Sequence, residues 1–105
     1  MQSLDLITCI VQRGEADKVV KQSLQEGAQG ATVYYGRGTG VRQKIGIFGS
    51  LIQPEKEIIL IVTPSDVTDR VFNACIIAGK LDLPGRGFAF VQKIDRAVGF
   101  LEMLK

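Results

Sequence analysis

The chain has 105 residues, of which 46% are hydrophobic and 23% are charged, and these values are typical of a folded domain rather than a disordered chain. Its 13 lysines and arginines exceed its 11 aspartates and glutamates by only two, which is too small an excess to indicate nucleic-acid binding by bulk charge. Histidine is absent, which removes the commonest general base and the commonest transition-metal ligand.

The organisation predicted from these values is a single domain over residues 1–105. The N-terminal residues lack the basic region and apolar stretch of a signal peptide. No uninterrupted apolar run approaches the roughly 20 residues that a membrane-spanning helix needs. We therefore expect a cytoplasmic protein.

The first half of the chain predicts a strand, a helix and a second strand. Residues 4–11 are rich in β-branched side chains and apolar on both faces, which is typical of a central strand. Apolar residues from Ala16 to Leu24 recur at helical spacing, and Gly27 suits the left-handed position that ends a helix. Residues 31–35 predict the next strand.

The second half repeats the pattern of strand, helix and strand after a glycine-rich segment. Residues 36–53 hold five glycines, three basic residues and no acid. Residues 55–63 predict a strand, and Pro64-Ser65-Asp66 offers an N-cap for a helix that ends at Gly79. Residues 87–93 predict the last strand, with Phe88 and Phe90 on one face, and residues 94–105 form a C-terminal tail.

This order predicts an α+β, ferredoxin-like β-α-β-β-α-β domain, with an antiparallel sheet and two helices on one of its faces. Because the strands at 6–11 and 58–62 are apolar on both faces, the face without helices would also need to be covered. A domain of this size buries a modest share of its surface, so oligomerisation through that open face is expected.

The two cysteines, Cys9 and Cys75, are too few for a disulfide framework. Each lies within an apolar pattern, so both are predicted to be buried thiols.

Two loops combine glycines with cations, and both are candidates for binding an anion. The first is Gly36-Arg37-Gly38-Thr39-Gly40-Val41-Arg42-Gln43-Lys44, and the second is Gly79-Lys80-Leu81-Asp82-Leu83-Pro84-Gly85-Arg86-Gly87. Glycines let backbone N–H groups point into a concavity, and arginine or lysine completes a phosphate or carboxylate site. The alternative interpretations are a solvated hairpin loop and a helix cap followed by a turn. The loops form one site only where the fold, or a neighbouring subunit, brings them together.

An RNA-binding module is the alternative function. Arg86-Gly87-Phe88-Ala89-Phe90-Val91 matches the first six places of the RNP1 pattern, in which exposed aromatic rings stack on bases. However, RNP1 belongs on the strand before the second helix, whereas this hexapeptide follows that helix. The last aromatic of the pattern is replaced by Lys93, and the first strand offers no aromatic for the partner motif.

Catalysis is the weaker interpretation, so we expect no enzyme activity. Acylphosphatases share this fold and use arginine with asparagine, but Asn73, the single asparagine, is predicted within a helix. The acidic residues are scattered, and neither cysteine is next to a base.

Three segments taken together resemble the PII family of nitrogen-regulatory signalling proteins. Residues 27–33 resemble the turn from the first helix into the second strand of that family. Gly38-Thr39-Gly40-Val41-Arg42-Gln43-Lys44 resembles the Gly-x-Gly-Arg-Gln-Lys that opens its T-loop, with Val41 inserted. Residues 79–86 resemble its B-loop, Gly-Lys-Ile-x-x-Gly-Lys, with one residue more. The similarity runs in matching order from about Leu4 to Lys93.

The resemblance implies a homotrimer that binds an adenine nucleotide (ATP, ADP or AMP) in the clefts between its subunits. By that likeness the adenine would contact Thr32, with Gly38 and Gly40 beside it. The phosphates would face Arg42, Gly85 and Arg86. Gln43 matches a glutamine that in many members ligates Mg²⁺ and thereby recruits 2-oxoglutarate. A flexible T-loop-like segment at about 40–53 would relay the bound ligand to a partner protein such as a membrane transporter, and direct nucleic-acid binding is not expected.

The sequence also departs from the family pattern. The T-loop, here Gly40 to Pro54, is several residues shorter and has no tyrosine, so uridylylation is not expected there. Two C-terminal arginines bind phosphate in the family. Only one of them has a counterpart in this chain, Arg96, and Lys93 lies near it in the sequence. The resemblance is therefore to a divergent PII-like protein.

Overall fold

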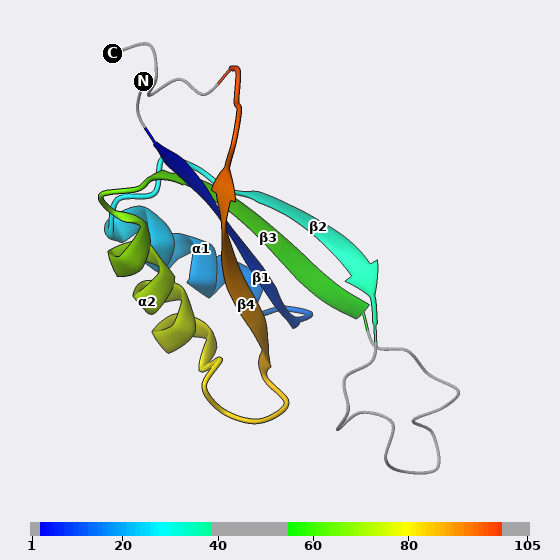
Figure 1. Ribbon diagram of the computed structural model, residues 1–105. Coiled ribbons are helices and arrows are strands. Elements are labelled where there is room, and N and C mark those ends of the chain that lie inside the picture. Colours follow the sequence, from blue (N-terminus) through cyan, green and yellow to red (C-terminus); the bar gives the residue numbers. More distant parts are fainter. Residues whose placement is uncertain (1–2, 39–54, 100–105) are drawn as a thin grey trace, which may run out of the picture.

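The computed structural model describes residues 3–38 and 55–99, and within them the predicted ferredoxin-like fold is confirmed (Figure 1). The elements are β1 (Leu4–Gln12), α1 (Ala16–Gln25), β2 (Thr32–Arg37), β3 (Glu55–Pro64), α2 (Thr68–Gly79) and β4 (Gly87–Ile94). The strands form an antiparallel sheet in the order β2-β3-β1-β4. No helix of this described part is long and apolar enough to span a lipid bilayer.

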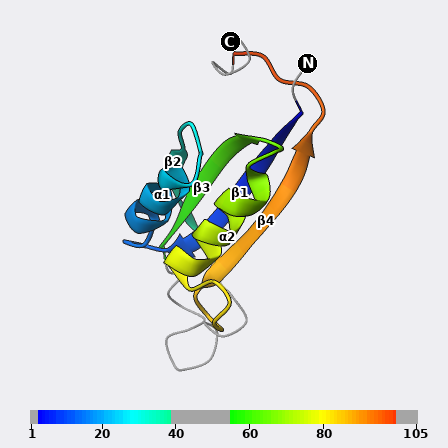
Figure 2. The ribbon, with the colours of Figure 1, turned by 90° about the vertical axis from the view of Figure 1, so that its left-hand side faces the viewer.

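The core lies between the sheet and the two helices, which pack against each other on one face of it (Figure 2). Alternate residues of β1 and β3 point into this layer, because side chains of a strand alternate between the two faces. The fully buried side chains include Ile7, Cys9, Val11, Val19, Ile59, Ile61, Val71 and Cys75. Both cysteines are thus buried, as predicted.

The start of α2 differs from the prediction. Neither Ser65 nor Asp66 caps this helix, which begins at Thr68 with Val67 in the N-cap position and no side-chain cap. Instead, the Thr68 hydroxyl donates to Oδ2 of Asp5 at 2.7 Å, so a buried carboxylate of β1 lies at the helix N-terminus. A carboxylate there is favourable because the helix dipole is positive at that end. The predicted cap was wrong because the strand next to the helix supplies the acid.

Asp5 is held by several contacts at this end of the sheet. Its Oδ1 lies 3.1 Å from Nζ of Lys93 on β4, but without hydrogen-bond geometry, so this contact is charge attraction. Burial alone raises the pKa of Asp5, and contacts with Thr68, Lys93 and Ser65 lower it by more, so the pKa of this carboxyl lies below its ordinary value.

The start of α1 is built in the same way from a distant acid. Glu15 is in the N-cap position without a side-chain cap. Oε1 of Glu57, on β3, accepts hydrogen bonds from the backbone N–H groups of Gly14 at 2.9 Å and Ala16 at 2.8 Å. The β1–α1 turn, residues 13–15, is therefore fixed to β3.

The residues that end the helices are partly as predicted. Gly27 follows α1 with a positive φ of 119°, as expected for a helix end. For α2, however, the left-handed residue is Lys80, with φ 53°, and Gly79 is the last helical residue. A Cβ at Gly79 would lie 3.1 Å from Cγ of Leu81 and 3.3 Å from Cγ2 of Val19, so close packing explains this glycine.

The face of the sheet away from the helices is apolar and uncovered within one protomer (Figures 1 and 2). The strand register places on it Tyr34 of β2, Ile58, Leu60 and Val62 of β3, Leu6 and Ile10 of β1, and Phe88 and Phe90 of β4. The Phe88 side chain is 62% exposed. This confirms that Phe88 and Phe90 share a face, and it leaves a broad hydrophobic surface for another molecule to cover.

The segment 39–54 and residues 100–105 lie outside the described residues. They hold Gly40, Arg42 and Gln43 of the predicted site, nearly all of the predicted T-loop, and the end of the tail.

Candidate ligand site

The described start of the first glycine-and-cation loop, residues 36–38, and the second loop lie at the same end of the sheet but at its opposite edges (Figure 1). Gly38 directly follows the edge strand β2, and residues 80–86 lead into the other edge strand, β4. The strands β3 and β1 lie between them. Three inter-strand spacings amount to roughly 14 Å, so within one protomer Gly38 and the 80–86 loop lie apart.

Thr32 is on the same edge as Gly38, near the other end of β2. It pairs with Leu60 of β3 and is exposed. Six residues of extended strand separate Thr32 from Gly38, which corresponds to about 20 Å. The predicted site residues that the structure describes therefore form two groups, Thr32 with Gly38 at one edge and Gly85 with Arg86 at the other.

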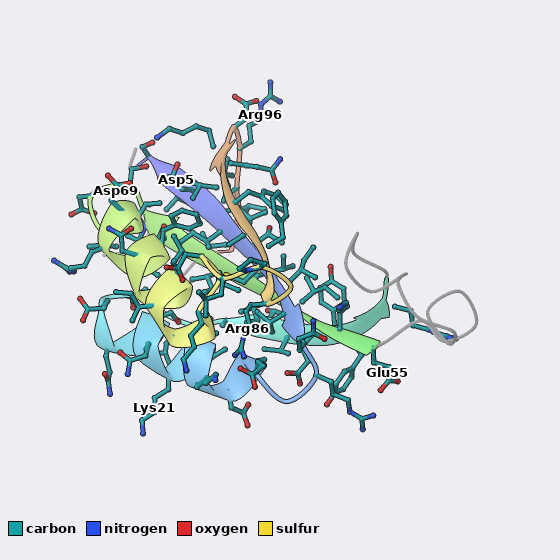
Figure 3. The ribbon with its side chains drawn as sticks, turned by 90° about the horizontal axis from the view of Figure 1, so that it is seen from below. Asp5, Lys21, Glu55, Asp69, Arg86 and Arg96 are labelled. Carbon is teal, nitrogen blue, oxygen red and sulfur yellow. The ribbon has the colours of Figure 1, made fainter. Side chains whose placement is uncertain are left out.

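Arg86 points from its loop toward the start of α1, as Figure 3 shows. Its Nη2 donates a hydrogen bond of 2.9 Å to Oε1 of Glu15, and its side chain is 34% exposed. Its Nε is buried and has no hydrogen-bond partner among the described residues. The guanidinium therefore has unused N–H groups, which suits it to receive an anionic ligand.

Glu15 is shared between two cations. The oxygen that accepts from Arg86 also lies 2.6 Å from Nζ of Lys18, one turn further along α1. The contact with Lys18 is the largest influence on the pKa of Glu15; burial opposes it, and Arg86 and Lys80 add to it, so the pKa lies below its ordinary value. Glu15 is thus ionised at neutral pH.

A second set of polar contacts crosses the open face of the sheet toward the same loop. The carbonyl of Gly85 accepts a hydrogen bond of 3.0 Å from Nε2 of Gln12. Oε1 of Gln12 accepts one of 3.3 Å from Nζ of Lys56, on the neighbouring strand β3. Gln12 therefore connects the 80–86 loop with the start of β3, the strand that follows the 39–54 segment.

Lys56 is the cation of this set, and its environment differs from that of an exposed lysine. It is half-buried on the open face, and burial lowers its pKa. Among the described residues it has no carboxylate at ion-pair distance, which leaves a cation between the two loops. Sequence analysis missed Lys56 and Gln12, although a lysine among the apolar residues of the open face is a signal that the strand alternation could have revealed.

The glycines of the 80–86 loop and of β4 have a structural reason. Gly85 has φ 79°, a left-handed conformation that side chains rarely adopt. Gly87 has φ 151°, and a Cβ there would lie 2.3 Å from the carbonyl oxygen of Ile10. Glycine is required at Gly87 because the backbone of β1 passes too close for any side chain.

The turn that carries Glu15 is also tied to the beginning of β3. Nη1 of Arg13 forms an ion pair of 2.6 Å with Glu55, the first described residue after the 39–54 segment. Two residues further on, Glu57 holds the backbone of the same turn. The β1–α1 turn thus contacts both the Arg86 side chain and the strand that follows the predicted T-loop.

Arg96 does not join Arg86 within one protomer. It lies beyond the far end of β4, as Figure 3 shows, and its Nε is 3.7 Å from Oδ2 of its neighbour Asp95. Lys93 is also at that end and contacts Asp5. The counterpart of the family's C-terminal arginines is therefore away from the 80–86 loop of the same chain.

Two further features bear on the alternative functions. The rings of Phe88 and Phe90 lie on the open face with their centroids 5.5 Å apart. Within residues 3–38 and 55–99, no cluster of three or more histidine, cysteine or acidic side chains could hold a metal ion.

Comparisons with known proteins agree with this architecture. No family model matches the chain, and no curated protein matches it in sequence. Among solved structures, it is similar to the PII protein of Arabidopsis thaliana in its citrate-bound crystal structure. The two are 25% identical, the match covers 89% of this chain and 78% of that chain, and the TM-score is 0.69. The chain therefore has the ferredoxin-like fold of PII proteins and is PII-like, as its three sequence segments indicated.

Proposed function

We propose that this chain is a non-enzymatic signalling protein that binds an adenine nucleotide in clefts between the subunits of a homotrimer. The observation that carries the proposal is the position of the two loops, at one end of the sheet but at opposite edges of it. A second protomer that places its β2 edge beside the 80–86 loop of the first would combine them into one cleft.

The uncovered face of the sheet supports assembly. It holds aromatic and aliphatic side chains from all four strands, including Tyr34, Leu60 and Phe88. A contiguous apolar face of this kind is unfavourable in water, and a second and third copy would bury it. The number three comes from the resemblance to PII proteins.

The charges near the 80–86 loop support an anionic ligand. Arg86 has an unpartnered buried Nε, and Lys56 has no acidic partner among the described residues. In the proposed cleft Arg86 and Gly85 face the phosphates of ATP, ADP or AMP, while Thr32 of the neighbouring subunit contacts the adenine. Gly38, about 20 Å further along β2, then lies at the phosphate end of the cleft. Gly40, Arg42 and Gln43 complete the site, with Gln43 holding Mg²⁺ when the metal is present.

The Arabidopsis thaliana PII protein binds citrate, which is itself a polyanion. By this likeness the proposed cleft takes ligands with several negative charges. The bound state would be read by a partner protein, with a membrane transporter as the favoured class, through residues 40–53. We place the protein in the cytoplasm, where unpaired thiols such as Cys9 and Cys75 stay reduced.

Isothermal titration with ATP, ADP and AMP tests the proposal, together with sedimentation to measure the oligomeric state. Arg86→Gln should weaken binding by about 10- to 100-fold, because a lost charged hydrogen bond costs roughly 1.5–3 kcal/mol. Lys21→Gln is the matched control, since Lys21 is an exposed cation on α1 away from Arg86 (Figure 3). An intact oligomer that binds none of the three nucleotides would contradict the proposal.

RNA binding is the second candidate, favoured by the exposed rings of Phe88 and Phe90 on the open face. It requires that this face stay accessible, so the protein would sediment as a monomer and bind single-stranded RNA. Phe88→Ser would then abolish RNA binding without changing the sedimentation coefficient. A trimer that does not bind RNA would rule out this alternative.

A further inference from the structure

We propose that Glu15 competes with the ligand for Arg86. In the unliganded protein Arg86 is paired with the Glu15 carboxylate, and on binding it exchanges this partner for the anionic group of the ligand. This inference rests on the proposed function, because it concerns the anion-binding half of the same cleft. It adds a regulatory residue that neither the loop motifs nor the glycine pattern indicated.

The resting contact of Arg86 is incomplete. Only its Nη2 reaches Glu15, at 2.9 Å, and it reaches a single carboxylate oxygen. An arginine and a carboxylate at their best form two parallel hydrogen bonds, which this pair does not. The Nε of Arg86 is meanwhile buried, and no atom within residues 3–38 and 55–99 accepts a hydrogen bond from it. A phosphate group offers three oxygens, so the guanidinium gains hydrogen bonds when it leaves Glu15 for a ligand.

Glu15 can release Arg86 at low cost because it has a second cation. The same Oε1 lies 2.6 Å from Nζ of Lys18, and this contact remains when Arg86 moves away. Leaving a half-buried carboxylate without any partner is costly, and here Lys18 prevents that. The exchange therefore leaves an ion pair, Glu15 with Lys18, and forms a new one between Arg86 and the ligand.

The structure also indicates which partner moves. Glu15 lies between Gly14 and Ala16, whose N–H groups are both fixed to Glu57. Arg86 lies in a loop that contains Gly85 in a left-handed conformation and is exposed at most of its residues. The backbone that carries Glu15 is thus anchored, while Arg86 is on the more exposed segment and points toward the start of α1 (Figure 3).

Two consequences follow for affinity. The unliganded protein gives up the Arg86–Glu15 contact each time it binds an anion, which lowers its affinity. The bound anion also lies near the Glu15 carboxylate, which repels it. Removing the charge of Glu15 should therefore tighten anion binding by about 2- to 5-fold, given that partly exposed ion pairs contribute up to about 1 kcal/mol.

The test is a calorimetric titration of wild type, Glu15→Gln and Asp17→Asn with ATP and, separately, with inorganic tripolyphosphate. Glu15→Gln should fold normally, because Glu15 makes no side-chain cap to α1. Asp17→Asn is the matched control, since Asp17 is an exposed acid of the same helix turn and forms no ion pair with the described residues. Tripolyphosphate probes the anion site without the adenine.

Tighter binding of both ligands by Glu15→Gln alone supports the proposal. Equal or weaker binding by Glu15→Gln overturns it, and weaker binding would mean that Glu15 positions Arg86 for the ligand. An equal gain in Asp17→Asn also overturns it, since the effect would then come from net charge. If tripolyphosphate binds with the expected gain but ATP does not bind, the inference stands and the nucleotide proposal fails. Binding of neither ligand to any variant overturns both.

Discussion

Replacing Glu57 by alanine should destabilise the protein by about 3 kcal/mol, although Glu57 lies outside the predicted ligand-binding residues. The side chain is 8% exposed, and its Oε1 accepts two backbone N–H groups at the start of α1, from Gly14 and Ala16. Hydrogen bonds to a charged group each contribute roughly 1.5–3 kcal/mol, and two that share one oxygen add incompletely. Alanine would leave both N–H groups without this partner.

Two variants of the same strand calibrate this value. Glu57→Gln keeps an acceptor oxygen and loses the charge, so we expect a cost of about 1 kcal/mol. Glu55→Ala removes an ion pair with Arg13 whose side chains are 48% and 69% exposed, and such pairs contribute below about 1 kcal/mol. The predicted order of destabilisation is therefore Glu57→Ala above Glu57→Gln, and Glu57→Gln at or above Glu55→Ala.

Urea unfolding followed by circular dichroism measures these differences. All variants need the same protomer concentration, because assembly adds a concentration-dependent contribution to the apparent stability. Stabilities of domains lie at about 5–15 kcal/mol, so Glu57→Ala should still fold. If Glu57→Ala lowers the free energy of unfolding by less than about 1 kcal/mol, or if Glu55→Ala lowers it as much as Glu57→Ala does, Glu57 does not hold the start of α1.

Three further predictions follow from the described residues. The pKa of Asp5 in the folded protein lies below its ordinary value of 3.8, so the ionised carboxylate stabilises the fold above that pH, and this stabilisation is lost as the pH falls. Asp5→Asn should thus be less stable than wild type at pH 7, and the difference between their urea midpoints should shrink toward pH 2. Because Cys9 and Cys75 are both fully buried, neither thiol should react with Ellman's reagent within minutes at pH 8, whereas both should react in denaturant. Rapid reaction of the native protein would contradict the buried pair. Gly87→Ala should cost several kcal/mol or prevent folding, because its Cβ would meet a backbone oxygen at 2.3 Å, while Gly30→Ala, with open space around it, should unfold at nearly the wild-type urea concentration.

The fold could be predicted because its signals are local. The spacing of apolar residues identifies the strands and helices, and glycines mark several of their ends. Together these signals give six elements in order, and only a few topologies are compatible with that order. The acids that hold the two helix starts were not predictable in this way. Glu57 contacts residues 41 and 43 positions earlier, and Asp5 contacts a residue 63 positions later. Only the assembled sheet places these acids at the helix ends.

The candidate site was likewise predictable only in part. The glycine-and-cation composition identified Arg86 and its loop, because glycine and charge are visible in the sequence. The partners of this loop were not identified, since Glu15 and Gln12 reach it across 71 and 73 residues. In the sequence Glu15 is one of several scattered acids, and its contacts with Arg86 and Lys18 in the structure distinguish it from Asp17.

The central claim, a ligand site shared between subunits, can be tested by mixing two inactive variants. Thr32→Tyr blocks the β2 side of the proposed cleft, and Arg86→Gln removes the guanidinium from the other side. Each variant alone should bind ATP weakly. When the two are unfolded together and refolded, some clefts should combine an intact Thr32 from one subunit with an intact Arg86 from another. Calorimetry should then recover a fraction of wild-type ATP sites in the mixture; no recovery in mixed oligomers would contradict a site between subunits.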